Sequence, residues 1–253
     1  MTADQGLTSV RLSRRATLAL ALALPGTVLT TGESEAESMK QDHDSAEQEK
    51  IRFLQNAAGQ LDRVAIIEIV QRERVARDMQ RWAELAHCYN PDSYVDISWF
   101  KGTGAAFAAA SEKMAGGGLR TFHQMGPTIV KIKRNRALTE TGCAIHLLVE
   151  VDRVEVDVIG HARLYARVER QPSDWLLSGF RVVYIQDLLV PLDPTHVPKI
   201  DSAVLATYRP SYRFVSFVLA RSGHPPRSDL PGLDKPAIVE ALSKAEETWL
   251  NEV

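Results

Sequence analysis

Cysteine is scarce in this chain of 253 residues, because Cys88 and Cys143 are the only two. Two cysteines cannot build a disulfide framework or a four-thiolate metal site. Positive charge is not in excess either, since 30 Lys and Arg stand against 32 Asp and Glu. A nucleic-acid partner is therefore not expected, because phosphate binding depends on a surplus of basic side chains.

Long hydrophobic runs are also missing. The longest candidate, residues 16–29, is shorter than the roughly 20 residues that a membrane-spanning helix needs, so no stable membrane anchor is expected. It follows Ser13-Arg14-Arg15, and this pattern resembles a twin-arginine export signal. Residues 1–36 are thus interpreted as a signal peptide that leads to the periplasm, and the alternative is a cytoplasmic protein with a disordered N-terminus. Seven carboxylates between residues 33 and 49 favour an acidic linker over residues 37–54.

No glycine-rich phosphate loop is present, and the elements that are present favour an α+β fold. Apolar spacing predicts a helix over residues 61–85, and an Ala-rich segment predicts another over 102–114. Asn90-Pro91-Asp92 indicates a turn, and alternation predicts strands over 94–99, 127–133, 142–152, 154–170 and 175–189. We expect residues 55–195 to form a curved antiparallel sheet folded over N-terminal helices around one pocket. Residues 196–253 read as a helical C-terminal extension that packs on this domain or on a partner subunit; its interleaved Arg and Tyr residues leave an anionic ligand as the lesser alternative.

Asp78 is the first candidate for chemistry. Ile67 and Asp78 are 11 residues apart, about three helical turns, so Asp78 should lie on the apolar face of its helix with Val64 and Val75. A carboxylate on a buried face needs a partner or a function. The structural alternative is an ion pair on the same helix, with Arg74, Arg77 or Arg81.

Four motifs in a fixed order resemble one known family. They are Asp78-x3-Trp82, residues 90–96 (Asn-Pro-Asp-x-Tyr-Val-Asp), residues 119–123 (Leu-Arg-Thr-Phe-His) and residues 175–181 (Trp-Leu-Leu-Ser-Gly-Phe-Arg). This pattern is similar to SnoaL-like proteins of the nuclear transport factor 2 (NTF2-like) superfamily, and most of all to scytalone dehydratase. The resemblance covers about residues 55–195 and implies a cone-shaped α+β fold.

The resemblance also implies a reaction. His123 would be the general base and Asp78 the carboxylate that orients it, in a lyase that eliminates water or another β-leaving group without a cofactor or a metal. A neutral imidazole can accept a proton near neutral pH, and a buried carboxylate stabilises the imidazolium that forms. The two tyrosines that hold a water in scytalone dehydratase correspond to Arg77 and Ile97, so scytalone itself is not the expected substrate.

Further side chains are candidates for contact with a small apolar or aromatic substrate. Strand alternation places three of them on one face, and these are His161, Arg163 and Tyr165. The other candidates are Trp82, Tyr94, Trp99, His146 and Arg181. His146 and His161 are expected to line or pack the pocket rather than to catalyse.

Several alternatives stay open at this point. The same His–Asp pair would serve an isomerase, and the domain would also suit a non-catalytic role in binding a ligand or in dimerisation. A homodimer or homotrimer is expected from the resemblance. A metal site built from Asp78, His123, His146 and His161 is disfavoured, because no close ligand spacing such as His-x3-His is present.

Overall fold

The computed structural model describes residues 31–224 and 226–252. The chain divides into two units, Met1–Phe53 and Leu54–Val253, and helix α1 (Thr31–Asp78) contributes to both. Residues 37–54, expected as an acidic linker, are helical, and the described side chains from Lys40 to Phe53 are exposed. Residues 33–53 contain neither Gly nor Pro and are rich in strong helix formers, which accounts for the helix.

Most of the expected export signal, residues 1–30, lies outside the described residues. Among the helices that are described, none combines the length and the apolar character needed to cross a membrane.

In the second unit, α1 buries a different face from the one expected. Ile66, Ile69 and Val70 are buried, whereas Val64 and Val75 are exposed. The expected helix over 61–85 is also interrupted, because α1 ends at Asp78 and α2 begins at Trp82 (Trp82–His87). The break is at Gln80, where φ is 57°, and the Arg81 amide donates to the Ala76 carbonyl at 2.7 Å across the turn. This left-handed helix ending reverses the chain and places Asp78 at the last position of α1.

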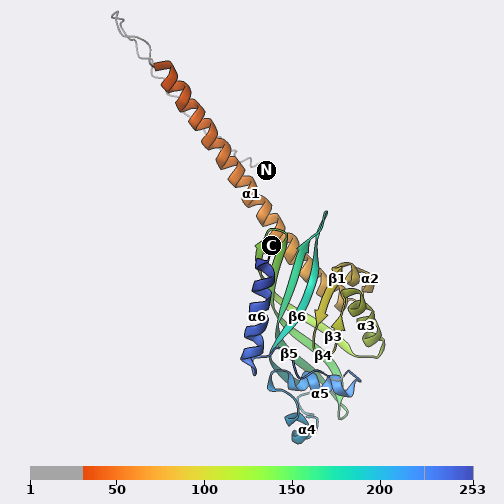
Figure 1. Ribbon diagram of the computed structural model, residues 1–253. Coiled ribbons are helices and arrows are strands. Elements are labelled where there is room, and N and C mark those ends of the chain that lie inside the picture. The colour runs from red at the N-terminus through yellow and green to blue at the C-terminus, as the bar shows by residue number, and fades with distance from the viewer. Residues whose placement is uncertain (1–30, 225, 253) are drawn as a thin grey trace, which may run out of the picture. The chain divides into compact units, whose positions relative to one another are not determined.

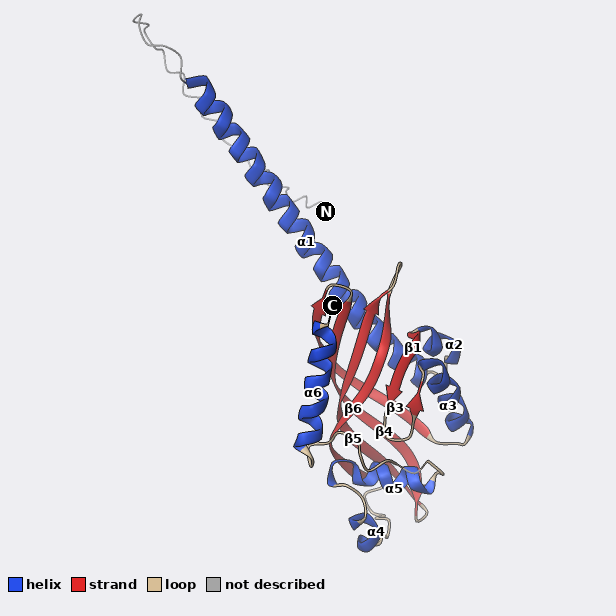
Figure 2. Cartoon of the chain, in the orientation of Figure 1, coloured by secondary structure: helices blue, strands red, loops and turns tan. Residues whose placement is uncertain are grey.

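The sheet has six strands in the order β2-β1-β6-β5-β4-β3 (Figures 1 and 2). The elements are β1 (Tyr89–Asp96), β2 (Lys101–Gly102), α3 (Gly104–Gly116), β3 (Arg120–Lys133), β4 (Arg136–Val151), β5 (Val154–Arg170) and β6 (Trp175–Pro191). The expected α+β fold, with a curved sheet and helices, is confirmed. Two details differ. The expected turn at residues 90–92 lies within β1, where the register shifts between Tyr89 and Tyr94, and β1 runs parallel to β6.

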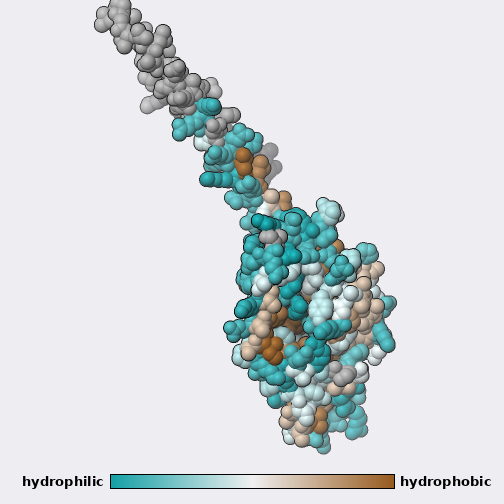
Figure 3. Space-filling model, viewed as in Figure 1, coloured by the Kyte–Doolittle hydropathy of each residue, from teal (hydrophilic) through white to brown (hydrophobic). Residues whose placement is uncertain are grey.

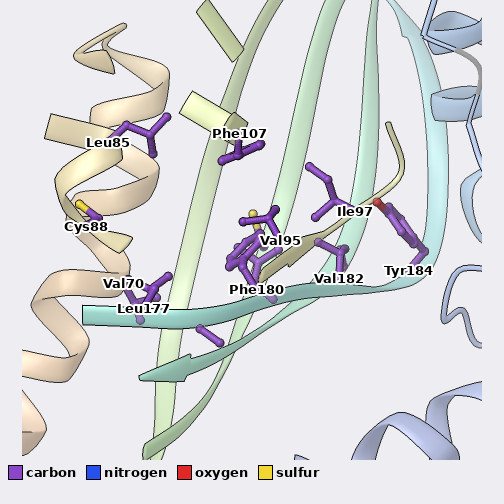
Figure 4. Packing of buried hydrophobic residues seen from close by; sticks show 14 of the residues in the cluster. Val70, Leu85, Cys88, Val95, Ile97, Phe107, Leu177, Phe180, Val182 and Tyr184 are labelled. Carbon is purple, nitrogen blue, oxygen red and sulfur yellow. The ribbon is translucent and has the colours of Figure 1, made fainter. Parts of the chain in front are cut away.

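Strands β3 to β6 form an antiparallel meander whose two faces differ in chemistry. We call the face that carries Leu164, Val182 and Tyr184 the inner face, and the opposite one, with Arg163 and Arg181, the outer face. Cross-strand partners share a face, so the pairs Leu164–Val182 and Ala162–Tyr184 fix this assignment. Figure 4 shows Val182, Tyr184 and Phe180 packed with Ile97 and Phe107 in the core on the inner side.

The C-terminal extension contains α4 (Ser202–Ala206), the 3-10 turn η1 (Pro210–Tyr212), α5 (Arg213–Arg221) and α6 (Pro236–Asn251). Asp187 of β6 fixes the start of α5 by accepting the Val215 amide at 2.8 Å. Helix α6 lies on the outer face, where Glu246 binds Arg167 at 2.6 Å and Arg181 at 2.9 Å. In Figure 3 the visible surface of this unit is mostly hydrophilic, with scattered apolar residues.

Candidate functional site

A cavity lies between the inner face and the helices that cover it, with about 540 Å³ of empty space including its mouth. Its wall is mainly apolar and comes from α1, β3 to β6, α3, α5 and the loops after β1 and α3. The apolar members are Ile97, Trp99, Met114, Leu119, Ile145, Leu147, Leu164, Phe180, Val182, Val215 and Leu219. The polar members are Arg74, Arg77, Ser98, Thr121, His123 and Tyr184. The pocket expected between sheet and helices is therefore present.

Asp78 and His123 meet at one end of this cavity. The His123 imidazole Nδ1 lies 2.7 Å from Asp78 Oδ1, and the His123 backbone amide donates to Oδ2 at 2.7 Å. Asp78 is the last residue of α1, and His123 is on the inner face of β3 opposite Ile145. One carboxylate thus binds both the ring and the backbone of the same histidine, which fixes the ring orientation.

The protonation states of this pair follow from its surroundings. Burial acts to raise the pKa of the Asp78 carboxyl, but the hydrogen bonds from His123 outweigh it and the pKa lies below its ordinary value. Burial, together with the positive charges of Arg74 and Arg77, lowers the pKa of His123 to about 4. At neutral pH the imidazole is therefore uncharged, with its proton on Nδ1 facing Asp78 and Nε2 unprotonated.

Arg74 lies beside Nε2 and is held by a buried carboxylate. Its Nη1 is 3.5 Å from His123 Nε2, while its Nε and Nη2 both bind Glu73, which is fully buried. Tyr89 also donates to Glu73, at 2.7 Å. Burial acts to lower the pKa of Arg74, but Glu73 outweighs it and raises the pKa, so Arg74 is a cation. Its guanidinium stacks on the Phe180 ring at 4.7 Å.

Arg77 is the second guanidinium at this end of the cavity. It donates to Thr121 Oγ1 at 2.8 Å, and Asp78 Oδ1 is 3.8 Å away. Burial and the nearby charge of Arg74 lower the pKa of Arg77 to about 10, still far above neutral pH. Thr121 and His123 are two residues apart on the inner face of β3, so the same strand positions the His123 imidazole and an acceptor for Arg77.

Two of the expected contact residues lie on the cavity side. Trp99 lines the cavity directly, packed against Phe107 with ring centroids 5.7 Å apart. Trp82 instead lines a neighbouring cavity that shares Arg77, Met114, Leu119 and Thr121 with the first. The break at Gln80 explains this displacement, because Trp82 belongs to a new helix rather than to the next turn of α1.

The remaining expected contact residues are on the outer face, away from the cavity, and these expectations are corrected. They are Tyr94, His146, His161, Arg163, Tyr165 and Arg181. The alternation was predicted correctly, but the face was not, since the small and apolar partners Ala162, Leu164 and Ala166 point inward. His146 pairs with Asp157 at 2.7 Å, and Arg181 binds Glu246 of α6.

No residue pattern predicted that the C-terminal extension contributes to the cavity wall. Val215 and Leu219 of α5 line it, and the Tyr184 hydroxyl oxygen of β6 accepts a hydrogen bond from the Ser98 amide at 3.1 Å. The signal that was available is the apolar spacing of Val215 and Leu219, four residues apart on one helix face. The residues described contain no group of three or more His, Cys, Asp or Glu side chains suited to a metal ion.

Comparisons with known proteins give relatives of low sequence identity. The chain is 25% identical over 206 residues to a PEP2-like protein of Fusarium vanettenii, covering 75% of this chain and 86% of that protein. It is 26% identical over 163 residues to pea pathogenicity protein 2 of the same fungus, covering 62% and 69%. Among solved structures, the hexachlorocyclohexane dehydrochlorinase LinA-type3 of Novosphingobium barchaimii aligns with 11% identity and a TM-score of 0.46, covering 58% of this chain and 99% of that one.

A family comparison gives the most direct assignment. Residues 60–181 match the model of the SnoaL-like domain. The matched range begins in the second unit's part of α1, includes Asp78, Arg77 and His123, and ends in β6. This part of the chain is therefore similar to SnoaL-like domains, the family that the four sequence motifs indicated.

Proposed function

We propose that this protein is a cofactor-independent lyase of the dehydratase type, in which His123 is the general base and Asp78 orients it. The observation that carries the proposal is the pairing at the cavity end. Nδ1 of His123 is occupied by Asp78 at 2.7 Å, so the basic Nε2 is left at the wall of a mainly apolar cavity. An imidazole fixed in this tautomer is suited to accept a proton from carbon.

The reaction is a β-elimination from a hydroxylated carbonyl compound. His123 Nε2 removes a proton from the carbon next to the carbonyl group, and the electron pair of that C–H bond moves to the carbonyl oxygen as an enolate. The enolate then reforms the carbonyl, a C=C bond forms, and the β-hydroxyl leaves. His123, now an imidazolium, returns its proton to the departing hydroxide, so water is released and the base is restored.

The apolar wall supports this chemistry in two ways. Leu147, Leu164 and Val182 favour an apolar cyclic or aromatic carbon skeleton. They also keep bulk water away from the enolate, which would otherwise be protonated before the leaving group departs. As negative charge develops on the substrate, the proton on His123 is stabilised, which offsets the low pKa of the imidazole in the empty cavity.

The test is a turnover screen of the purified chain with cyclic and aromatic β-hydroxy ketones, including hydroxylated steroids and polyketides. Products are measured by mass spectrometry, and the expected product has lost the mass of one water. The variants His123→Gln and Asp78→Asn should abolish or strongly reduce this product, while the outer-face variant His146→Gln should not. Turnover that survives in both inner variants would contradict the mechanism, and a product of unchanged mass would identify an isomerase instead.

We further propose that the chain is exported to the periplasm and assembles as a homodimer or homotrimer. The support for export is the Ser13-Arg14-Arg15 pattern before an apolar run, and the support for the assembly is the similarity to SnoaL-like proteins. Mass spectrometry of the mature protein from its native host tests export, and an intact Met1 would contradict it. Light scattering of the purified protein tests the assembly, and a monomer would contradict it.

A further inference from the structure

Two positive charges and no negative one face the cavity, among the residues that the structure describes. Arg74, Arg77, His123 and Tyr184 are its titratable wall residues, and His123 is uncharged at neutral pH. The carboxylates of Glu73 and Asp78 lie behind this wall, each bonded to a cavity residue. A ligand in the cavity therefore meets N–H donors and positive charge at the same end as the base.

The two guanidinium groups differ in how far their charge is compensated. Arg74 is bonded through two nitrogens to the fully buried Glu73, so its charge is neutralised and its orientation is fixed. Arg77 has neutral acceptors within hydrogen-bonding distance in the described part of the chain, Thr121 Oγ1 and, at 3.9 Å, Met114 Sδ. Asp78 is 3.8 Å from Arg77, close enough to attract its charge but too far for a hydrogen bond, and both carboxylate oxygens of Asp78 bind His123.

We propose that Arg77 is a catalytic residue that binds the substrate's carbonyl oxygen and stabilises it as an oxyanion, with Arg74 positioned beside it. This inference rests on the proposed function and deepens it. Arg77 places a permanent cation in the cavity wall, so the expected substrate carries an oxygen that becomes anionic during the reaction. The class is a β-hydroxy carbonyl compound with an apolar ring, bound with its carbonyl oxygen at Arg77.

The charge balance of the reaction agrees with this assignment. When the proton moves to His123, the imidazolium adds one positive charge to a wall that already holds two guanidinium groups. The enolate oxygen supplies the negative charge at the same step, and a buried guanidinium binds it far more strongly than water would. When the hydroxide leaves with the His123 proton, both charges disappear together, and the cavity returns to its starting state.

The experiment uses 4-nitrophenolate as a stable stand-in for an enolate and 4-nitroanisole as a neutral molecule of similar shape. Binding is measured by absorbance and fluorescence for the full chain. The wild-type protein should bind the phenolate at least about 10-fold more tightly than the anisole. The bound dye should also show the phenolate spectrum at a pH where the free dye is mostly protonated, a measurement that needs no variant. A bound dye with the neutral spectrum would overturn the proposal.

Arg77→Gln is the decisive variant, and Arg163→Gln is its matched control because it removes the same charge from the outer face. Arg77→Gln should weaken phenolate binding by about 100-fold and leave anisole binding within about 3-fold. Arg163→Gln should change neither value. Equal loss of both probes would mean that Arg77 only supports the cavity wall, and an unchanged phenolate affinity would mean that it does not bind the oxygen; either result overturns the proposal.

His123→Gln separates this inference from the proposed function. It should abolish elimination and retain the preference for phenolate, since His123 is uncharged. A phenolate preference that depends on Arg77, without turnover of any β-hydroxy ketone, would leave the oxyanion site standing and refute the lyase. His123-dependent turnover without that preference would refute the oxyanion site and leave the lyase standing.

Discussion

Two histidine–aspartate pairs occupy the two faces of the same sheet. On the inner face His123 Nδ1 lies 2.7 Å from Asp78, and on the outer face His146 Nδ1 lies 2.7 Å from Asp157. The two pairs have the same distance between the imidazole Nδ1 and a carboxylate oxygen, but the surroundings of the two rings differ. Nε2 of His123 is at the wall of a cavity beside Arg74, whereas His146 is stacked on the Phe122 ring with centroids 4.2 Å apart.

This difference teaches that the distance between an imidazole and a carboxylate does not define a catalytic site. The second nitrogen of His146 is buried, and the described residues offer it no hydrogen-bond partner. A substrate therefore cannot approach His146 Nε2 closely enough to transfer a proton to it. The inner pair has what the outer one lacks, namely an adjoining cavity and the N–H donors of Arg74 and Arg77 in its wall.

The largest expected effect is on turnover, and it should differ between the two histidine–aspartate pairs. His123→Gln should reduce kcat for a β-hydroxy ketone by about a thousandfold, because the general base is lost. His146→Gln should leave kcat within about twofold, since that ring has no access to a substrate. The measurement is steady-state kinetics with product detected by mass spectrometry. A comparable loss in both variants would show that the comparison between the faces is mistaken.

The next effect concerns the stability of the two faces. Glu73 and Arg74 form an ion pair whose side chains are 0% and 4% exposed, whereas Glu140 and Arg163 on the outer face are 35% and 48% exposed. Glu73→Gln leaves the Arg74 charge buried without a counterion and should lower the free energy of unfolding by about 3 kcal/mol. Glu140→Gln, its matched control, should lower it by less than about 1 kcal/mol. Urea denaturation at neutral pH measures both, and equal losses would contradict the expectation.

The pH dependence of stability should distinguish the same two histidines. The pKa of His123 is about 4 in the folded protein against an ordinary 6.5, so the unfolded chain binds more protons between these values. This contribution to stability is complete above about pH 6.5 and is lost as the pH falls toward 4. Between about pH 7.5 and pH 5 the loss should be about 2 kcal/mol.

A variant is needed to isolate this effect, because Asp187 acts in the opposite direction. Burial raises its pKa to about 6, so its unfavourable contribution grows as the pH rises through the same range. His123→Gln should remove the loss of about 2 kcal/mol between the two pH values, and His146→Gln should retain it. Denaturant unfolding at both pH values gives the comparison. A slope that is unchanged in His123→Gln would show that this histidine is not buried in its neutral form.

The sequence was sufficient for the inner pair and for the order of the elements. Asp78 and His123 stand in motifs whose residue types identify them, and strands β3 to β6 follow from alternation between clear turns. The face of each strand was harder to predict. His161, Arg163 and Tyr165 alternate with Ala162, Leu164 and Ala166, and both sets are compatible with a pocket wall until α6 is known to cover the polar set.

The break after Asp78 was missed for a different reason. Gln80 adopts a positive φ of 57° without being glycine or asparagine, so no residue type signals the end of α1. The part of the C-terminal extension in the cavity was equally hidden, since Val215 and Leu219 show only that α5 has an apolar face. Which surface that face covers depends on contacts between residues far apart in the chain, such as the one between Asp187 and Val215.

The smallest expected effect tests whether the outer pair is only structural. Asp157 Oδ1 and His146 Nε2 are both buried and lack partners in the described part of the chain, so this pair carries unsatisfied polar atoms. Asp157→Val alone should lower the free energy of unfolding by about 1.5 kcal/mol, because the His146 Nδ1 proton then loses its acceptor. The double variant His146→Leu/Asp157→Val should restore stability to within about 0.5 kcal/mol of the wild type, since both polar groups are removed together.

Urea denaturation of the wild type, both single variants and the double variant gives the coupling between the two residues. If the double variant were less stable than Asp157→Val alone, the outer pair would hold the sheet together, and the two pairs would differ in role but not in importance.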